Sequence, residues 1–128
     1  MYQKRKVKNK LTSKVPKGGV MLSVLVEFSM FPTSADGRDG ASVSKSVSKI
    51  IDAIDKSGIP YQLTPMGTVF EAPSMKEALA VLEMAYEQLS DLERVYSSLK
   101  FDIRKNCENR LKTKIESVEK VLNRKVSH

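Results

Sequence analysis

Hydrophobic and polar residues alternate along two long segments, one near each end of the chain. Over residues 21–31, one side is wholly apolar and consists of Leu22, Val24, Val26, Phe28 and Met30. Over residues 95–104, one side carries Leu99, Phe101 and Ile103, and the other carries Ser98, Lys100, Asp102 and Arg104. Alternation with a period of two is typical of a half-buried β-strand. We therefore predict two long strands, each with one face in the core.

Three other segments have apolar residues at helical spacing. The first helix is expected to begin near Ser42, a plausible N-cap, and to end at Gly58. The second begins with Ser74 and Glu77, which form a capping box, and the third covers about 109–124. The expected inner residues are Val43, Val47, Ile50, Ile51 and Ile54, then Ala78, Leu79, Leu82, Tyr86 and Leu89, then Leu111, Ile115, Val118 and Leu122.

Two short strands, 61–64 and 68–72, are predicted between the first two helices. The resulting order is β-α-β-β-α-β-α, and two interlocked β-α-β units of this kind make a ferredoxin-like α+β sandwich. We therefore expect a four-stranded antiparallel sheet with two helices on one face, plus an extra C-terminal helix. The two long strands should be central neighbours, so that their outward polar residues share one surface.

The net charge of +7 is concentrated in the first twenty residues. The seven bases there are Lys4, Arg5, Lys6, Lys8, Lys10, Lys14 and Lys17, without any acid. Removing these seven from the 22 bases leaves 15, which equals the 15 acids. The remainder is therefore neutral, and it gives no support for the electrostatic capture of nucleic acid.

We interpret residues 1–20 as a basic, disordered tail and residues 21–125 as one domain. The run Lys17-Gly18-Gly19-Val20-Met21 is what an in-frame bacterial ribosome-binding site and start codon would encode. This raises the hypothesis that the natural chain begins at Met21, which the intact mass of the protein from its native host would test.

Cysteine and histidine are too scarce for several kinds of chemistry. The one cysteine, Cys107, excludes an internal disulfide and a multi-cysteine metal site. It fits the reducing cytoplasm, which is the expected location. The one histidine, His128, is the last residue, so a histidine-based triad or zinc site is not expected. An apolar run long enough to span a membrane is absent from the sequence.

The outward face of the two long strands is the first candidate site. Glu27 and Asp102 are acids on adjacent predicted strands, where they could hold a cationic or amino-bearing ligand. Alternatively, they pair with Lys100 and Arg104 as part of a solvated charged face.

Two loops are further candidates. The loop 33–42 leads into a helix start, where free N–H groups favour anions, or it is a plain surface loop. In Met66-Gly67-Thr68 the glycine allows a close backbone approach, or it forms a simple hairpin turn.

Several groups of residues occur in the order found in a known family. They are Phe31-Pro32, Ser42-Val43-Ser44, Tyr61-Gln62-Leu63-Thr64-Pro65-Met66-Gly67-Thr68 with Glu71, Arg94-Val95-Tyr96, Lys100-x-Asp102-x-Arg104 and Lys114-Ile115-Glu116-Ser117-Val118. Through them the chain from residue 21 to about 122 resembles the small, single-domain branch of the YkoF-like thiamine-binding proteins.

This resemblance implies a protein that binds a small molecule without catalysis and without a cofactor. It implies thiamine or its hydroxymethylpyrimidine part as the ligand, and a homodimer or homotetramer formed through sheet faces or edges. The resemblance places Ser42, Ser44, Met66, Gly67, Thr68, Lys100, Asp102 and Arg104 at or near the ligand crevice. From the sheet face we add Glu27. The family tends to have an aromatic residue where this chain has Ser46, so the ligand here could differ or bind more weakly.

Three other functions are compatible with the same element order. An RNA-binding domain needs outward aromatic residues on its central strands, which the predicted positions lack. An acylphosphatase-like enzyme would use Arg38 together with a strand asparagine, and the predicted strands contain none. The remaining alternative is an oligomeric regulatory or protein-interaction module with a different ligand or none, which a thermal-shift panel of metabolites would distinguish.

Overall fold

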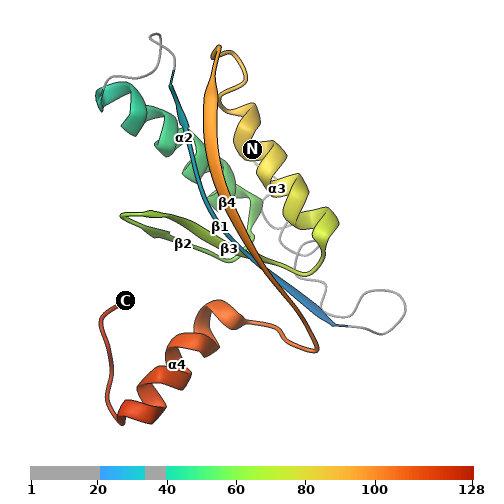
Figure 1. The fold of residues 1–128 in the computed structure, drawn as a ribbon, viewed down its shortest axis with the longest axis vertical. Coiled ribbons are helices and arrows are strands. Elements are labelled where there is room, and N and C mark those ends of the chain that lie inside the picture. The colour runs from blue at the N-terminus through green and yellow to red at the C-terminus, as the bar shows by residue number, and fades with distance from the viewer. Residues whose placement is uncertain (1–20, 34–39) are drawn as a thin grey trace.

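The computed structural model describes residues 21–33 and 40–128 (Figure 1). The strands are β1 (Leu22–Pro32), β2 (Tyr61–Thr64), β3 (Gly67–Ala72) and β4 (Val95–Lys105). The helices are α2 (Gly40–Ser57), α3 (Met75–Glu87) and α4 (Arg110–Leu122). The predictions for the tail 1–20 and for most of the loop 33–42 lie outside the described residues.

The four strands form one antiparallel sheet in the order β2-β3-β1-β4. This confirms the predicted ferredoxin-like α+β fold with its additional C-terminal helix. The expectation that both long strands are central is wrong for β4, which lies at the edge beside β1. The reason is that the right-handed connection through α3 carries the chain over β1 to the far side of the sheet.

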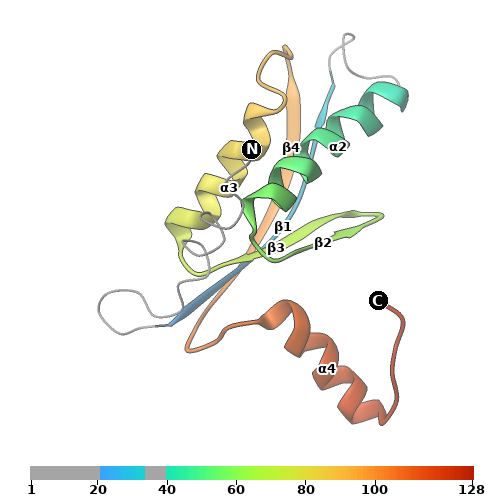
Figure 2. The same ribbon diagram turned by 180° about the vertical axis from the view of Figure 1, so that it is seen from behind.

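The core lies between the sheet and the two helices α2 and α3, which cover the same face (Figures 1 and 2). The apolar side of β1 is buried there, as the alternation predicted. The buried residues of this layer include Val24, Val26, Phe28, Phe70, Ile50, Ile54, Ala78, Val81 and Ala85.

The inner side of α3 differs from the prediction at two positions. Leu79 and Tyr86 are 53% and 45% exposed, whereas Val81 and Ala85 are buried. Small residues allow α3 to approach the sheet closely, and the two larger ones lie on a flank of the helix. The N-terminal cap is as predicted, because the Ser74 hydroxyl accepts a hydrogen bond from the Glu77 N–H at 3.1 Å.

The apolar side of β4 points to the helix side of the sheet but remains exposed. Leu99, Phe101 and Ile103 are 43%, 38% and 50% exposed. They pair with Phe28, Val26 and Val24 of β1, so their direction is as predicted. They remain uncovered because α3 packs mainly on β1 and β3.

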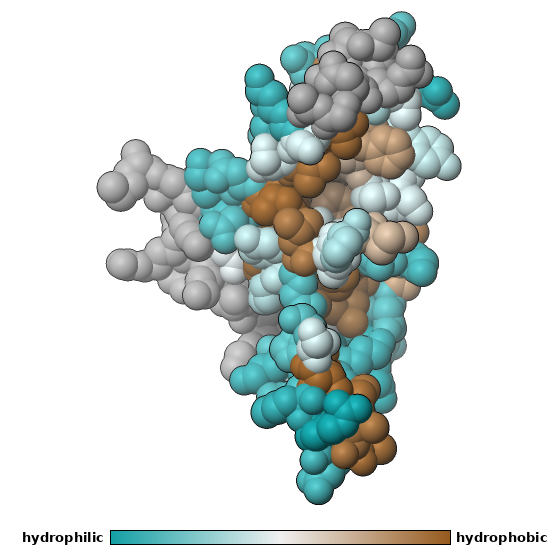
Figure 3. All heavy atoms as spheres, turned by 90° about the vertical axis from the view of Figure 1, so that its left-hand side faces the viewer, coloured by the Kyte–Doolittle hydropathy of each residue, from teal (hydrophilic) through white to brown (hydrophobic). Residues whose placement is uncertain are grey.

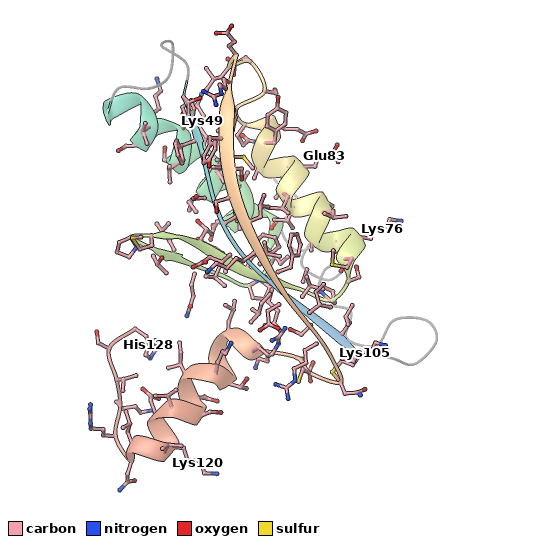
Figure 4. The ribbon with its side chains drawn as sticks, in the orientation of Figure 1. Lys49, Lys76, Glu83, Lys105, Lys120 and His128 are labelled. Atoms are coloured by element: carbon pink, nitrogen blue, oxygen red, sulfur yellow. The ribbon has the colours of Figure 1, made fainter. Side chains whose placement is uncertain are left out.

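The helix α4 begins on the opposite face of the sheet from α2 and α3. Its first residue, Arg110, is buried against Ser23, while the rest of the helix extends away from the sheet (Figure 1). Val118 and Leu122, predicted to face inward, are therefore about half exposed. After α4 the chain turns back along the helix to His128 (Figure 4). The Val126 N–H donates to the Glu119 carboxylate at 2.9 Å.

Candidate functional site

A groove lies between α2 and the hairpin formed by β2 and β3. Its inner part is a cleft of about 180 Å³. Val43 and Val47 of α2 form one wall, and Phe28 of β1 contributes to the floor. Its lining is mainly apolar and comes from α2, β1 and the hairpin.

The hairpin is stabilised by the hydroxyl of Thr64. This hydroxyl donates to the carbonyl of Gly67 at 2.8 Å and accepts from the N–H groups of Met66 and Gly67 at 3.2 and 3.1 Å. The Pro65-Met66 loop is therefore held against the strand ends, and Met66, 86% exposed, projects at the mouth of the groove.

Gly67 is required by close contact between neighbouring strands. A Cβ atom at this position would lie 2.9 Å from the backbone oxygen of Phe28, closer than van der Waals contact allows. The strand pairing of β1 with β3 holds that oxygen in place, so it cannot move aside as a flexible side chain could.

We expect Gly67→Ala to lower the free energy of unfolding by about 1–3 kcal/mol, because overpacking moves the backbone. Met66→Ala is the matched control and should change stability by less than about 0.5 kcal/mol, since the side chain is exposed. Urea unfolding of the two variants checks this, and equal midpoints would contradict the steric argument.

The groove continues into an outer, open trough of about 700 Å³. Val43, Val47, Ile51 and Leu63 line both parts, so the cleft and the trough are continuous. Figure 3, which views the molecule from the side where the hairpin tip lies, shows apolar surface over this region and a separate apolar patch near the end of α4.

Two carboxylates lie in the wall of the trough. Asp52 is 2.9 Å from the ammonium group of Lys56, and Asp55 accepts a hydrogen bond from the Tyr61 hydroxyl at 3.0 Å. Burial, together with the hydrogen bond to Asp55 and the negative charge of that group, raises the pKa of Tyr61. Tyr61 therefore stays a neutral donor at physiological pH, and the trough retains acidic character at this end.

Several residues predicted at the ligand site line this groove. Met66, Gly67 and Thr68 border the inner cleft, and Ser44 borders the trough. The side chain of Ser42 lies outside the described ones. Ser46, where the resembling family tends to have an aromatic residue, is buried and is not part of the groove wall.

The charged candidates lie on the opposite face of the sheet. Glu27 is 3.6 Å from the ammonium group of Lys100, as the solvated-pair alternative predicted. Asp102 pairs with Arg110 at 3.0 Å and Lys114 at 3.8 Å, and not with Arg104 as that alternative expected, because α4 brings its two bases to this carboxylate. Because the sheet separates the two groups, the predicted residues do not form one crevice within a single chain.

The charged group also borders a hollow of its own. Asp102 and Arg104 line a space of about 450 Å³ beside the start of α4. It is separated from the groove by the full thickness of the sheet, because even-numbered residues of β4 point away from α2 and α3.

Sequence reasoning missed a buried polar network on that face. The Ser23 hydroxyl donates to the Glu71 carboxylate at 2.6 Å and accepts from Arg110 Nε at 2.9 Å. Arg110 also donates to the backbone oxygens of Ser23 and Asp102, at 3.0 and 2.6 Å. The available signal was Glu71, an acid between Phe70 and Ala72 on a short strand that otherwise reads as buried.

The described residues contain neither a metal centre nor a membrane span. Within residues 21–33 and 40–128, His, Cys, Asp and Glu do not gather in a group of three or more that could hold a metal ion. None of the described helices is both long and apolar enough to cross a membrane.

The fold places this chain among the ferredoxin-like α+β proteins. The model of the family described as thiamine-binding protein matches residues 26–119, a range that contains the groove and most of the sheet. The chain belongs to this thiamine-binding protein family. A UPF0045 protein of Methanocaldococcus jannaschii is 37% identical over 99 residues, which cover 77% of this chain and 94% of that relative.

Solved structures show the same arrangement. The crystal structure of the Methanocaldococcus protein has a TM-score of 0.61 and covers 75% of this chain and 95% of its own. A domain from Bacillus cereus has a TM-score of 0.59 at 26% identity, covering 72% and 88%. A Thermotoga maritima protein described as a candidate thiamine biosynthesis or salvage protein has a TM-score of 0.53 at 21% identity, covering 75% and 98%, and supports the fold alone.

Proposed function

We propose that this protein binds thiamine or its hydroxymethylpyrimidine part, without chemical change, in the groove between α2 and the β2–β3 hairpin. The observation that carries the proposal is a narrow apolar cleft that opens into a trough bearing two carboxylates. Family membership supports a ligand of this class. The reducing cytoplasm is the proposed location.

The size of the cleft suits one ring of the ligand. At about 180 Å³ it is smaller than the 300–1,000 Å³ of a typical site for a larger ligand. A flat aminopyrimidine ring could lie between Val47 and Phe28, while the Thr68 hydroxyl at the cleft offers a polar contact for the amino group or a ring nitrogen. Most of the binding free energy would come from apolar surface removed from water.

The acidic trough is suited to the second ring of the ligand. Thiamine carries a positively charged thiazolium ring, whereas hydroxymethylpyrimidine is neutral. Asp52 and Asp55 place negative charge along the route by which the cation would leave the cleft. The proposed orientation therefore has the pyrimidine inside and the thiazolium outside, and Ser46 does not affect it because Ser46 is not in the groove wall.

Calorimetric titration of thiamine into Val47→Trp tests the location. The indole would fill the inner cleft, and we expect the affinity to fall at least about tenfold, or 1.4 kcal/mol. Val121→Trp is the matched control, because Val121 is a highly exposed valine on α4. Unchanged binding in Val47→Trp would remove the groove as the site.

Two double variants then distinguish binding in the groove from binding on the opposite face of the sheet. Asp52→Asn combined with Asp55→Asn should weaken thiamine binding and leave hydroxymethylpyrimidine binding unaffected. Glu27→Gln combined with Asp102→Asn should leave both unaffected. If only the variant of Glu27 and Asp102 lost affinity for thiamine, the site would lie on the face of the sheet opposite α2 and α3. If none of a panel of metabolites bound the unmodified protein, the alternative of an interaction module would be favoured.

A further inference from the structure

We propose that the groove selects the free alcohol forms of its ligand and rejects their phosphate esters, because the outer trough repels a phosphate group. The proposal rests on the proposed function, in which thiamine or hydroxymethylpyrimidine occupies the groove between α2 and the β2–β3 hairpin. It adds which chemical form of these molecules the protein holds, and it names the two side chains that make the choice, Asp52 and Asp55.

The charged side chains that line the groove have one sign. The described residues that line the inner cleft include no charged side chain. Those that line the trough include two acids, Asp52 and Asp55, and no base. Lys56 pairs with Asp52 at 2.9 Å, but it is not one of the residues that line the trough. A ligand group that enters the trough therefore meets negative charge directly.

The position of the two acids on their helix strengthens this effect. Asp52 and Asp55 lie near the C-terminal end of α2, which ends at Ser57. The last carbonyl groups of a helix carry partial negative charge, so that end favours cations and disfavours anions. The helix end and the two carboxylates therefore act on a ligand in the same direction. Acids at this end oppose the stability of the helix itself, which suits a role in binding rather than in folding.

The hydroxyl groups of the trough are also poorly suited to a phosphate. The Tyr61 hydroxyl donates its proton to Asp55 at 3.0 Å, and the Ser48 hydroxyl donates its proton to the carbonyl of Lys45 at 2.8 Å. A hydroxyl group has one proton to donate and can still accept. These two groups and the carboxylates therefore present acceptors to a ligand, whereas a phosphate needs donors.

Both ligands would direct their hydroxyl group into the trough. With the pyrimidine ring in the inner cleft, the thiazolium ring of thiamine and its hydroxyethyl arm lie outside. Hydroxymethylpyrimidine carries its hydroxyl on the carbon that bears the thiazolium in thiamine. An alcohol can donate a hydrogen bond to a carboxylate, but its phosphate ester brings about two negative charges and only acceptor oxygens at pH 7. The same two acids would therefore reject both esters.

Calorimetric titration of the unmodified full chain tests the selection. We expect thiamine monophosphate to bind at least about tenfold more weakly than thiamine, and hydroxymethylpyrimidine phosphate to differ from hydroxymethylpyrimidine in the same direction. The difference should become smaller as salt is added, because the Asp52 side chain is 62% exposed and exposed charges are screened.

The double variant Asp52→Asn, Asp55→Asn should narrow each difference to less than about threefold, since it removes the repelling charge and adds amide donors. Its affinity for hydroxymethylpyrimidine phosphate should rise, while that for hydroxymethylpyrimidine stays the same. Glu83→Gln combined with Glu87→Gln is the matched control. It changes the net charge equally at exposed positions on α3, where Glu83 projects outward (Figure 4), and should leave every difference intact.

The outcomes separate this proposal from the one on which it rests. If thiamine binds, Val47→Trp abolishes the binding, and thiamine monophosphate binds as tightly as thiamine, the groove remains the site but the selection is overturned. A difference that persists in the aspartate variant would also overturn it, because the shape of the groove would then reject the ester. If thiamine does not bind at all, the proposed function fails and this proposal fails with it.

Discussion

Replacing Arg110 by alanine is expected to lower the free energy of unfolding by about 3 kcal/mol. The Arg110 side chain is 8% exposed and pairs with Asp102 at 3.0 Å, while Nε donates to the Ser23 hydroxyl. Removing it leaves the Ser23 hydroxyl and the backbone oxygens of Ser23 and Asp102 without this donor. The loss of one partner from a buried charged group typically costs about 3–5 kcal/mol, and the partial exposure of Asp102 places this case at the lower end.

The loss of stability in Arg110→Ala should be largest in α4. Hydrogen exchange of α4 should rise most in Arg110→Ala, because the helix contacts the sheet chiefly through its first turn. Arg104→Ala is the matched control, since Arg104 is exposed on β4, and it should change stability by less than about 0.5 kcal/mol. If Arg110→Ala unfolds at the same urea concentration as the unmodified protein, the network does not anchor α4.

Replacing Phe70 by alanine should be at least as damaging, at about 4 kcal/mol. Phe70 is fully buried and packs edge-to-face on Phe28, with ring centroids 5.9 Å apart. The truncation removes apolar contacts and leaves a cavity beneath the helices. Because Phe28 also forms the floor of the groove, the same change should weaken ligand binding.

Thermal and urea unfolding check this second result. Leu63→Ala is the matched control on the neighbouring strand, because Leu63 is mostly exposed, and it should cost less than about 1 kcal/mol. If Phe70→Ala does not fold, Phe70→Leu provides a smaller change with an expected loss of about 1–2 kcal/mol. A loss in Leu63→Ala as large as that in the Phe70 variants would contradict the assigned core.

The fold was predictable because its signals are local. Alternation in β1 and helical spacing in α2 reflect an apolar side of each element that faces the core, and the buried Val24, Val26, Ile50 and Ile54 confirm both. The element order then restricts the topology to very few arrangements, since chain connections are short and right-handed. The capping of α3 by Ser74 was predictable for the same reason, because it depends on residues three positions apart.

The predictions from sequence were wrong where the burial of a residue depends on elements far away in the chain. Leu79 and Tyr86 have the hydrophobicity of core residues, but the layer of helices ends at α3 and leaves that flank exposed. The position of β4 at the edge similarly exposes a row that alternation alone assigns to the core. Both differences occur at the boundary of the packed layer, which local pattern does not reveal.

In the candidate site, too, local features were predictable from the sequence and long-range contacts were not. The motif residues Met66, Gly67 and Thr68 were found from sequence because a glycine in a tight hairpin is a local requirement. That they border the same groove as Val47, while Glu27 and Asp102 lie on the other face, follows from strand parity and from where α2 packs. The partnership of Arg110, Ser23 and Glu71 joins three distant segments, so the sequence contained its members but not their contact.

By itself, the sequence determined the elements, their order and the neutral charge of the chain after residue 20, because each depends on residues near one another or on composition. Only the tertiary structure decided which apolar residues remain exposed, which polar residues are buried, and on which face of the sheet each candidate ligand contact lies. Those outcomes depend on the packing of segments far apart in the chain, and the free energy of burial is set by the neighbours that packing supplies.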